Sequence, residues 1–173
     1  TTPYIKKFII ENFGINKKKI RIIPNYVDTE IFKAKNSKKN NYKKFVTITR
    51  VDKQKNLEFM FNEILIAKAS LDVIGYGKNN EKYRKIIKKI NAKIKFLGPI
   101  NSVNISKKFS KYDFFISTSK YEGNPKTILE SMSAKLPVIA TSVEGIKDII
   151  KDGKNGFIIN NKKGSLARKL DLI

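Results

Sequence analysis

The feature that most constrains the fold is a regular alternation, from about residue 45 onward, of short apolar runs with stretches of helical periodicity. Short apolar runs rich in β-branched and aromatic residues are typical of strands buried on both faces. Six such runs occur, at 45–49, 71–74, 93–97, 113–118, 137–141 and 156–159. Helical stretches separate them, at 57–68, 80–90, 102–110, 125–134 and 145–150. The pattern predicts an α/β fold with a doubly wound, mainly parallel, six-stranded Rossmann-like sheet.

The first 43 residues are organised differently. Residues 2–13 have helical periodicity and Gly14 follows as a stop signal, which predicts an amphipathic helix. A strand-like run at 20–23 ends before a proline, and residues 33–43 form a polar linker. We therefore expect the main domain to cover residues 44–173. Because no apolar run is long enough to cross a membrane, we expect the chain to be soluble.

The residue types limit the chemistry that the chain can perform. Cysteine and histidine are absent, which excludes thiolate metal sites, cysteine nucleophiles and the commonest general base. The formal net charge is +22, from 37 Lys and Arg against 15 Asp and Glu, and only four of the cations are arginines. Such charge is compatible with solvated lysines, with an anionic membrane surface or with nucleic acid. Because arginine is scarce, we expect no specific nucleic-acid partner.

Unusual residues collect where ligands of open parallel sheets bind, beyond the carboxyl ends of the strands. Arg50 and Lys55 follow the first predicted strand. Gly-Tyr-Gly at 75–77 follows the second strand, and we interpret it as a tight turn. Residues 119–125, with the sequence SKYEGNP, follow the fourth strand. This edge of the sheet is therefore the candidate binding site.

The loop after the fourth strand predicts an anion site at a helix start. Asn124 is a favourable N-cap, and Pro125 suits the first helical position. The early amides, on Lys126 and Thr127, have no acceptor within the helix and favour an anion together with the helix dipole. Gly123 lets that anion approach the backbone closely.

Two glutamates flank this helix start. Glu130 lies four residues after Lys126 and is expected to face along the crevice, where a carboxylate suits a pair of hydroxyls such as those of a ribose. Glu122 precedes the anion site and would meet whatever is attached to the far phosphate, for example a sugar. The alternative is that Glu122 is an exposed acid and that Glu130 simply pairs with Lys126.

Several segments together resemble glycosyltransferase family 4, the retaining nucleotide-sugar transferases of GT-B fold, and specifically their C-terminal donor-binding domain. The segments are IIPNYVDTEIF at 22–32, TRVDKQKNLE at 49–58, LDVIGYG at 71–77, IKFLGPI at 94–100, EGNPKTILESMSAKLPVIAT at 122–141 and DGKNGFII at 152–159. The resemblance covers nearly the whole chain and includes a Glu-x7-Glu motif. It implies that residues 1–43 are the end of a missing N-terminal domain plus a crossover linker.

By position, the resemblance implies a role for each site residue. Arg50 and Lys55 would neutralise the donor diphosphate together with the amides after Gly123, and Glu122 would contact the transferred sugar; these three side chains are the expected catalytic set. Glu130 would hold the ribose and Ile100 would lie against the base. No Asp-x-Asp sequence occurs, so a metal-independent enzyme without cofactor is expected, with a UDP- or GDP-sugar as substrate.

The implied function is transfer of a hexosyl group to a glycan or lipid-linked acceptor in surface polysaccharide or glycolipid synthesis. The chain alone is expected to be inactive because the acceptor domain is missing, and to be cytoplasmic, with peripheral contact to anionic membrane at the inner face of the plasma membrane. Three residues depart from the family pattern: Thr49, Tyr26 and Leu136 replace glycines. Two alternatives remain, a non-enzymatic nucleotide or nucleic-acid binding module, and a glycosidase pair made by Glu122 and Glu130.

Overall fold

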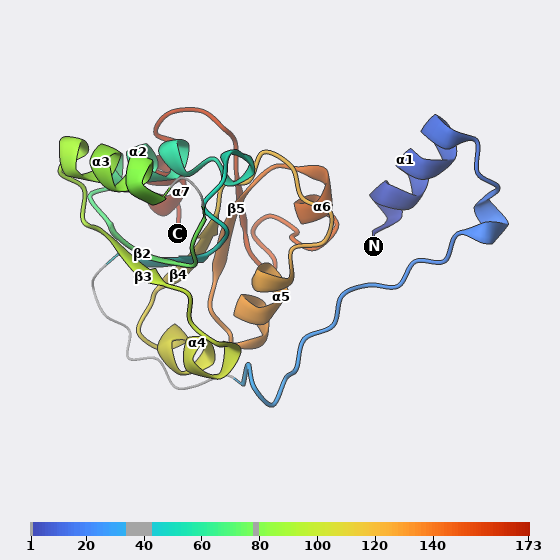
Figure 1. Ribbon diagram of the computed structural model, residues 1–173, viewed down its shortest axis with the longest axis horizontal. Helices are drawn as coiled ribbons and strands as arrows, with labels where there is room; N and C mark the ends of the chain where they lie inside the picture. Colours follow the sequence, from blue (N-terminus) through green and yellow to red (C-terminus); the bar gives the residue numbers. More distant parts are fainter. Residues whose placement is uncertain (1, 34–42, 78–79) are drawn as a thin grey trace.

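The computed structural model, which describes residues 2–33, 43–77 and 80–173, contains one six-stranded sheet (Figure 1). Its strands are β1 (Lys44–Ile48), β2 (Ser70–Ile74), β3 (Ile94–Gly98), β4 (Phe114–Ser117), β5 (Val138–Thr141) and β6 (Phe157–Ile159). The strand order is β3-β2-β1-β4-β5-β6, and every neighbouring pair is parallel. The predicted doubly wound fold is therefore confirmed, with a wholly parallel sheet.

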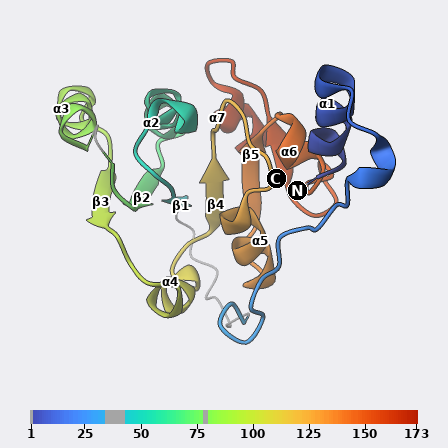
Figure 2. The same cartoon turned by 45° about the vertical axis from the view of Figure 1, so that its right-hand side comes forward.

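Helices cover both faces of the sheet. They are α1 (Pro3–Phe13), α2 (Leu57–Ile66), α3 (Asn80–Ile90), α4 (Ser102–Phe109), α5 (Lys126–Ser133), α6 (Glu144–Lys147) and α7 (Ser165–Leu170). Helices α2, α3 and α7 pack on one face, and α4, α5 and α6 on the other (Figures 1 and 2). Because both faces are covered, the central strands are mostly apolar, and all four residues of β5 are buried.

The segment before the sheet contributes to the core of the domain. Phe32 is 3% exposed and stacks at an angle on Phe109 of α4, with 6.1 Å between ring centroids. Its carbonyl accepts a hydrogen bond from Ser133 at the end of α5 (3.0 Å). The residues just before the linker therefore already belong to the α4–α5 face.

Helix α1 has the predicted bounds and lies beside α6 (Figures 1 and 2). Thr2 caps it, and Gly14 ends it in the left-handed conformation with φ 63°. No residue of α1 is buried, and no helix in the described ranges is long and apolar enough to span a membrane. The strand-like run at 20–23 forms no strand, because no neighbouring strand pairs with it before Pro24 ends the run. Residues 34–42 of the predicted linker lie outside the described residues.

Candidate functional site

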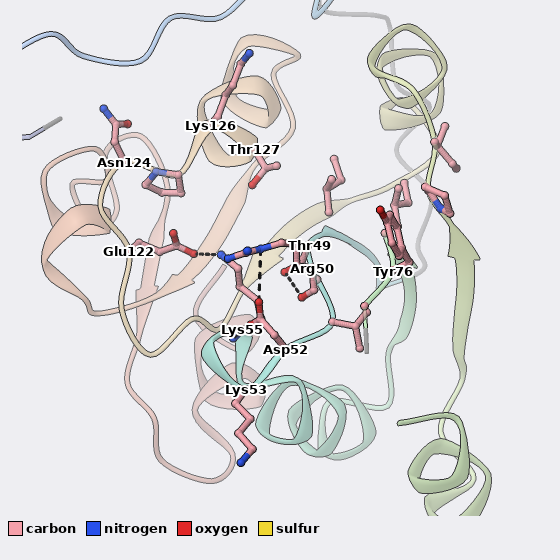
Figure 3. A pocket seen from close by; sticks show the side chains of 18 residues that line it. Thr49, Arg50, Asp52, Lys53, Lys55, Tyr76, Glu122, Asn124, Lys126 and Thr127 are labelled. Atoms are coloured by element: carbon pink, nitrogen blue, oxygen red, sulfur yellow. Dashed lines mark hydrogen bonds and ion pairs between the residues drawn. The ribbon is translucent and has the colours of Figure 1, made fainter. Parts of the chain in front are cut away.

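A cleft of about 920 Å³ opens at the carboxyl ends of the central strands (Figure 3). Successive strands are added on one side of β1 as far as β3 and then on its other side from β4 to β6, so the strand order reverses at the parallel pair β1 and β4. The loops after these two strands therefore diverge and leave a crevice there. The loops after β2 and β3 complete the wall. The lining residues include seven of the predicted site residues, namely Arg50, Lys55, Ile100, Glu122, Asn124, Lys126 and Thr127. Gly123 and Glu130 are not among them.

The glycines after β2 allow two loops to touch. A Cβ at Gly75, whose φ is 128°, would overlap the carbonyl oxygen of Thr49, and one at Gly77 would lie 2.6 Å from the carbonyl oxygen of Val51. The backbone amides of Thr49 and Val51 donate to carbonyls of the β2 side at 2.9 and 3.2 Å. The interpretation of these glycines as a tight turn is therefore incomplete, because their absent side chains also let the β1 and β2 loops pack backbone to backbone.

Helix α5 begins one residue later than predicted. Pro125, with ψ 102°, is the N-cap, and no side chain caps the helix, so the prediction that Asn124 is the N-cap is wrong. The Asn124 carbonyl instead accepts a hydrogen bond from the Asn25 amide (2.7 Å), which holds the loop from outside the helix. The first intrahelical bond runs from Ile128 N–H to Pro125 O (3.1 Å). The amides of Lys126 and Thr127 come before this bond and have no acceptor within the helix. Amides of this kind at a helix N-terminus can donate to an anion.

Lys55 and Glu122 meet at the centre of the cleft. The Lys55 Nζ lies 2.5 Å from Glu122 Oε1 (Figure 3), and their side chains are only 18% and 11% exposed. The hydroxyl of Ser119 donates to the same carboxylate oxygen at 2.6 Å. The alternative of an exposed Glu122 is therefore wrong, because two donors hold its carboxylate inside the site.

Arg50 has a different environment. Its side chain is 75% exposed and pairs with Asp52 at 3.5 Å. Gln54 joins this loop to the loop after β4. Its side-chain amide donates to Tyr121 O and its backbone carbonyl accepts from Lys120 N–H, both at 2.9 Å. Arg50 can therefore move toward a ligand, whereas Lys55 is held in place.

Glu130 lies one turn into α5 and is 8% exposed. Burial raises the pKa of its carboxyl above the usual range, and the ammonium of Lys126 acts in the opposite direction. The Lys126 ammonium also lies 5.4 Å from the ring centroid of Tyr26, one of the residues that depart from the family pattern. Leu136, a second departure, is buried in the core, and Thr49, the third, lines the cleft.

Sequence reasoning missed three residues that shape the site: Ser119, Gln54 and Asp52. Gln54 contacts Tyr121, 67 positions away, in the loop after β4, and Asp52 pairs with Arg50. The Ser119 to Glu122 contact is local, three residues apart, so a serine three places before a candidate acid was an available signal. Within the described residues, no group of three Asp or Glu side chains is arranged to hold a metal ion.

Solved glycosyltransferases share this fold. The structure matches a glycosyltransferase from Rickettsia africae with a TM-score of 0.84 and 22% identity, over 99% of this chain and 51% of that one. It matches HepE of Anabaena, solved in complex with UDP and glucose, with a TM-score of 0.83 and 17% identity over 99% and 51% of the chains.

The sequence comparisons identify the family. The O-antigen biosynthesis glycosyltransferase WbnH of Escherichia coli is 30% identical over 97% of this chain, which spans 47% of that protein. The chain thus spans about half the length of that curated relative. Residues 28–173 match the sequence model of the family described as Glycosyl transferases group 1. A match over most of the chain shows that this protein belongs to the group 1 glycosyl transferases, as the C-terminal half of their GT-B fold.

Proposed function

We propose that this chain holds the nucleotide-sugar donor in a retaining, metal-independent enzyme of glycosyltransferase family 4. The observation that carries the proposal is the convergence of Arg50, Lys55 and the first turn of α5 on one cleft. Two cations and a helix N-terminus around one volume suit a diphosphate, the group common to UDP- and GDP-sugars. The complex of a structural neighbour with UDP and glucose supports a uridine donor among these.

The diphosphate would lie between the two loops that the sheet brings together. Arg50 and Lys55 neutralise it, and the amides of Lys126 and Thr127 donate to its oxygens, while Gly123 leaves room beside the backbone. When the bond between the sugar and the phosphate breaks, negative charge grows on the leaving diphosphate. The cations of Arg50 and Lys55 stabilise that charge, as a divalent ion does in other enzymes.

The remaining roles follow the resemblance. Ile100, in the cleft wall after β3, would lie against the base, and Glu122 would contact the sugar. Glu130 is assigned to the ribose on the resemblance alone, because it does not line the cleft. Because Glu122 lines the cleft and Glu130 does not, the two glutamates do not fit a glycosidase, in which both carboxyls must face one sugar cleft. The non-enzymatic alternative finds no support in the family match.

The acceptor and the location are further parts of the proposal. A relative named for O-antigen synthesis favours a glycan or lipid-linked acceptor, bound by a second domain without which the chain does not turn over. The net charge of +22 favours peripheral attachment to anionic lipid at the cytoplasmic face, at about 1 kcal/mol per lysine near the surface. Flotation should be stronger with anionic than with neutral vesicles at low salt. Equal flotation would refute the attachment.

A ligand panel tests the donor site directly. The thermal unfolding of the 173-residue chain would be followed with UDP, GDP and ADP, with and without a chelator. A ligand at about 100 times its Kd stabilises by about 2.7 kcal/mol, and we expect this from one diphosphate, without loss on chelation. Arg50→Ala should reduce the shift, whereas Arg21→Ala, an exposed arginine outside the cleft, should not. No shift with any diphosphate would refute the donor site.

A further inference from the structure

Ser119 has a buried hydroxyl directed at the carboxylate of Glu122. It is 1% exposed, does not line the cleft, and donates to Glu122 Oε1 at 2.6 Å. Its own carbonyl accepts a hydrogen bond from the buried hydroxyl of Thr141 at 2.7 Å, which fixes Ser119 to the end of β5. The hydroxyl therefore comes from a rigid part of the domain rather than from a loop tip.

Within the described residues, hydrogen bonds hold the carboxylate of Glu122 on one oxygen. Oε1 accepts from both Ser119 and Lys55, which approach from the β4 and β1 loops. The backbone behind it is also confined, because a Cβ at Gly145 would overlap the carbonyl oxygens of Glu122 and Gly123. With the backbone and Oε1 both fixed, the direction of the second oxygen, Oε2, is determined.

We propose that Ser119 is a positioning residue for the transferred sugar, which acts by turning Oε2 of Glu122 toward a sugar hydroxyl. The inference rests on the proposed donor site. Without the Ser119 hydroxyl, Oε1 keeps only its contact with the ammonium of Lys55, and a single contact leaves the carboxylate able to turn about its side-chain bonds. Oε2 then no longer keeps one direction, and the sugar hydroxyl loses a fixed acceptor.

The experiment compares donors with and without a sugar. Calorimetry would give the Kd of the diphosphate that binds in the panel and of its glucose, galactose and N-acetylglucosamine esters, and the ratio is the sugar-dependent gain. Ser119→Ala should lower that gain about five- to tenfold and leave the diphosphate Kd unchanged. Ser106→Ala is the matched control, a serine 5% exposed in α4 that bonds only to Val103 O among the described residues. It should change neither value.

Two further variants separate positioning from folding. Ser119→Cys keeps nearly the same volume with a weak donor, so it should fold even if the alanine variant does not, and should lose part of the gain. In a Glu122→Ala background, Ser119→Ala should have no additional effect on sugar binding, because the two act through one contact.

The outcomes distinguish this inference from the donor site itself. If no diphosphate binds the unchanged chain, the proposed function fails and the inference fails with it. If the diphosphate binds but Ser119→Ala leaves the sugar-dependent gain intact, only the positioning role is overturned. It is also overturned if no sugar adds affinity in the unchanged chain, or if Ser119→Ala weakens diphosphate and sugar ester equally.

Discussion

Replacing Lys55 by methionine separates the structural and the binding contributions of the central ion pair. Lys55→Met removes the charge and keeps a similar length, which leaves the Glu122 carboxylate with the Ser119 hydroxyl alone. Exposed pairs contribute about 0–1 kcal/mol, and breaking a fully buried pair costs about 3–5 kcal/mol. With side chains 18% and 11% exposed, this pair lies between these limits, so we expect a loss of about 2 kcal/mol. In a chain of this size that lowers the Tm by about 4–8 °C.

The ligand response of the same variant should be larger than its stability response. Losing a charge-assisted hydrogen bond to phosphate costs about 1.5–3 kcal/mol, or about 10- to 150-fold in diphosphate affinity, while the bare nucleoside should bind nearly as before. The double variant Lys55→Met with Glu122→Gln removes the unpaired carboxylate. It should therefore recover most of the lost stability and none of the lost diphosphate affinity.

Urea or thermal melts with calorimetry on UDP and uridine measure both responses. Lys53→Met is the control for stability, because Lys53 and Lys55 belong to one short 3₁₀ helix (Lys53–Lys55) and the side chain of Lys53 points away from Glu122 (Figure 3). It should change the stability by less than about 0.5 kcal/mol. Recovery of diphosphate affinity in the double variant would show that the pair is only a structural salt bridge, and the assignment of Lys55 to the phosphates would be wrong.

Three further predictions concern the surroundings of the site. Gly145→Ala should cost about 2 kcal/mol or more in a urea melt because its Cβ has no room, whereas Gly123→Ala, with nothing within 4 Å of its Cβ, should be close to neutral; equal costs would contradict the packing argument. The amide of Ile158 lowers the pKa of Asp152, so Asp152→Asn should reduce the urea midpoint at neutral pH, and the difference should vanish as the pH falls through that lowered pKa. Burial raises the pKa of Glu130, so Glu130→Gln should stabilise the empty chain above the ordinary glutamate pKa and not below it; a variant less stable at neutral pH would refute this.

The sequence by itself determined the class of the fold and indicated the edge of the sheet at which the cleft opens. The alternation of apolar runs and helical stretches requires strands buried on both faces, and only a parallel sheet between helical layers provides that environment. Ligands bind at the carboxyl ends of such strands, so Arg50, Lys55 and the loop around Glu122 were predicted to form the site. The fold class is confirmed because it depends on local periodicity, which the sequence contains directly, and a cleft lies at the indicated edge of the sheet.

Local sequence was a weaker guide to the start of α5. Asn124 and Pro125 are a favourable N-cap and first helical residue, yet the helix begins at Lys126. Asn25, 99 positions away, binds the carbonyl of Asn124 instead. The start of α5 therefore lies one residue later than local sequence predicts, in a loop that also carries this tertiary hydrogen bond. Helix propensities are too weak to fix a helix boundary to within one residue.

Only the tertiary structure decided which residues meet in the cleft. The order β3-β2-β1-β4-β5-β6 makes β1 and β4 neighbours, which brings Lys55 against Glu122 across 67 positions of sequence. The same packing buries Glu130, which does not line the cleft. Strand order and side-chain burial follow from how the helical layers fill space around the sheet, and that long-range packing leaves no periodic signal in the chain.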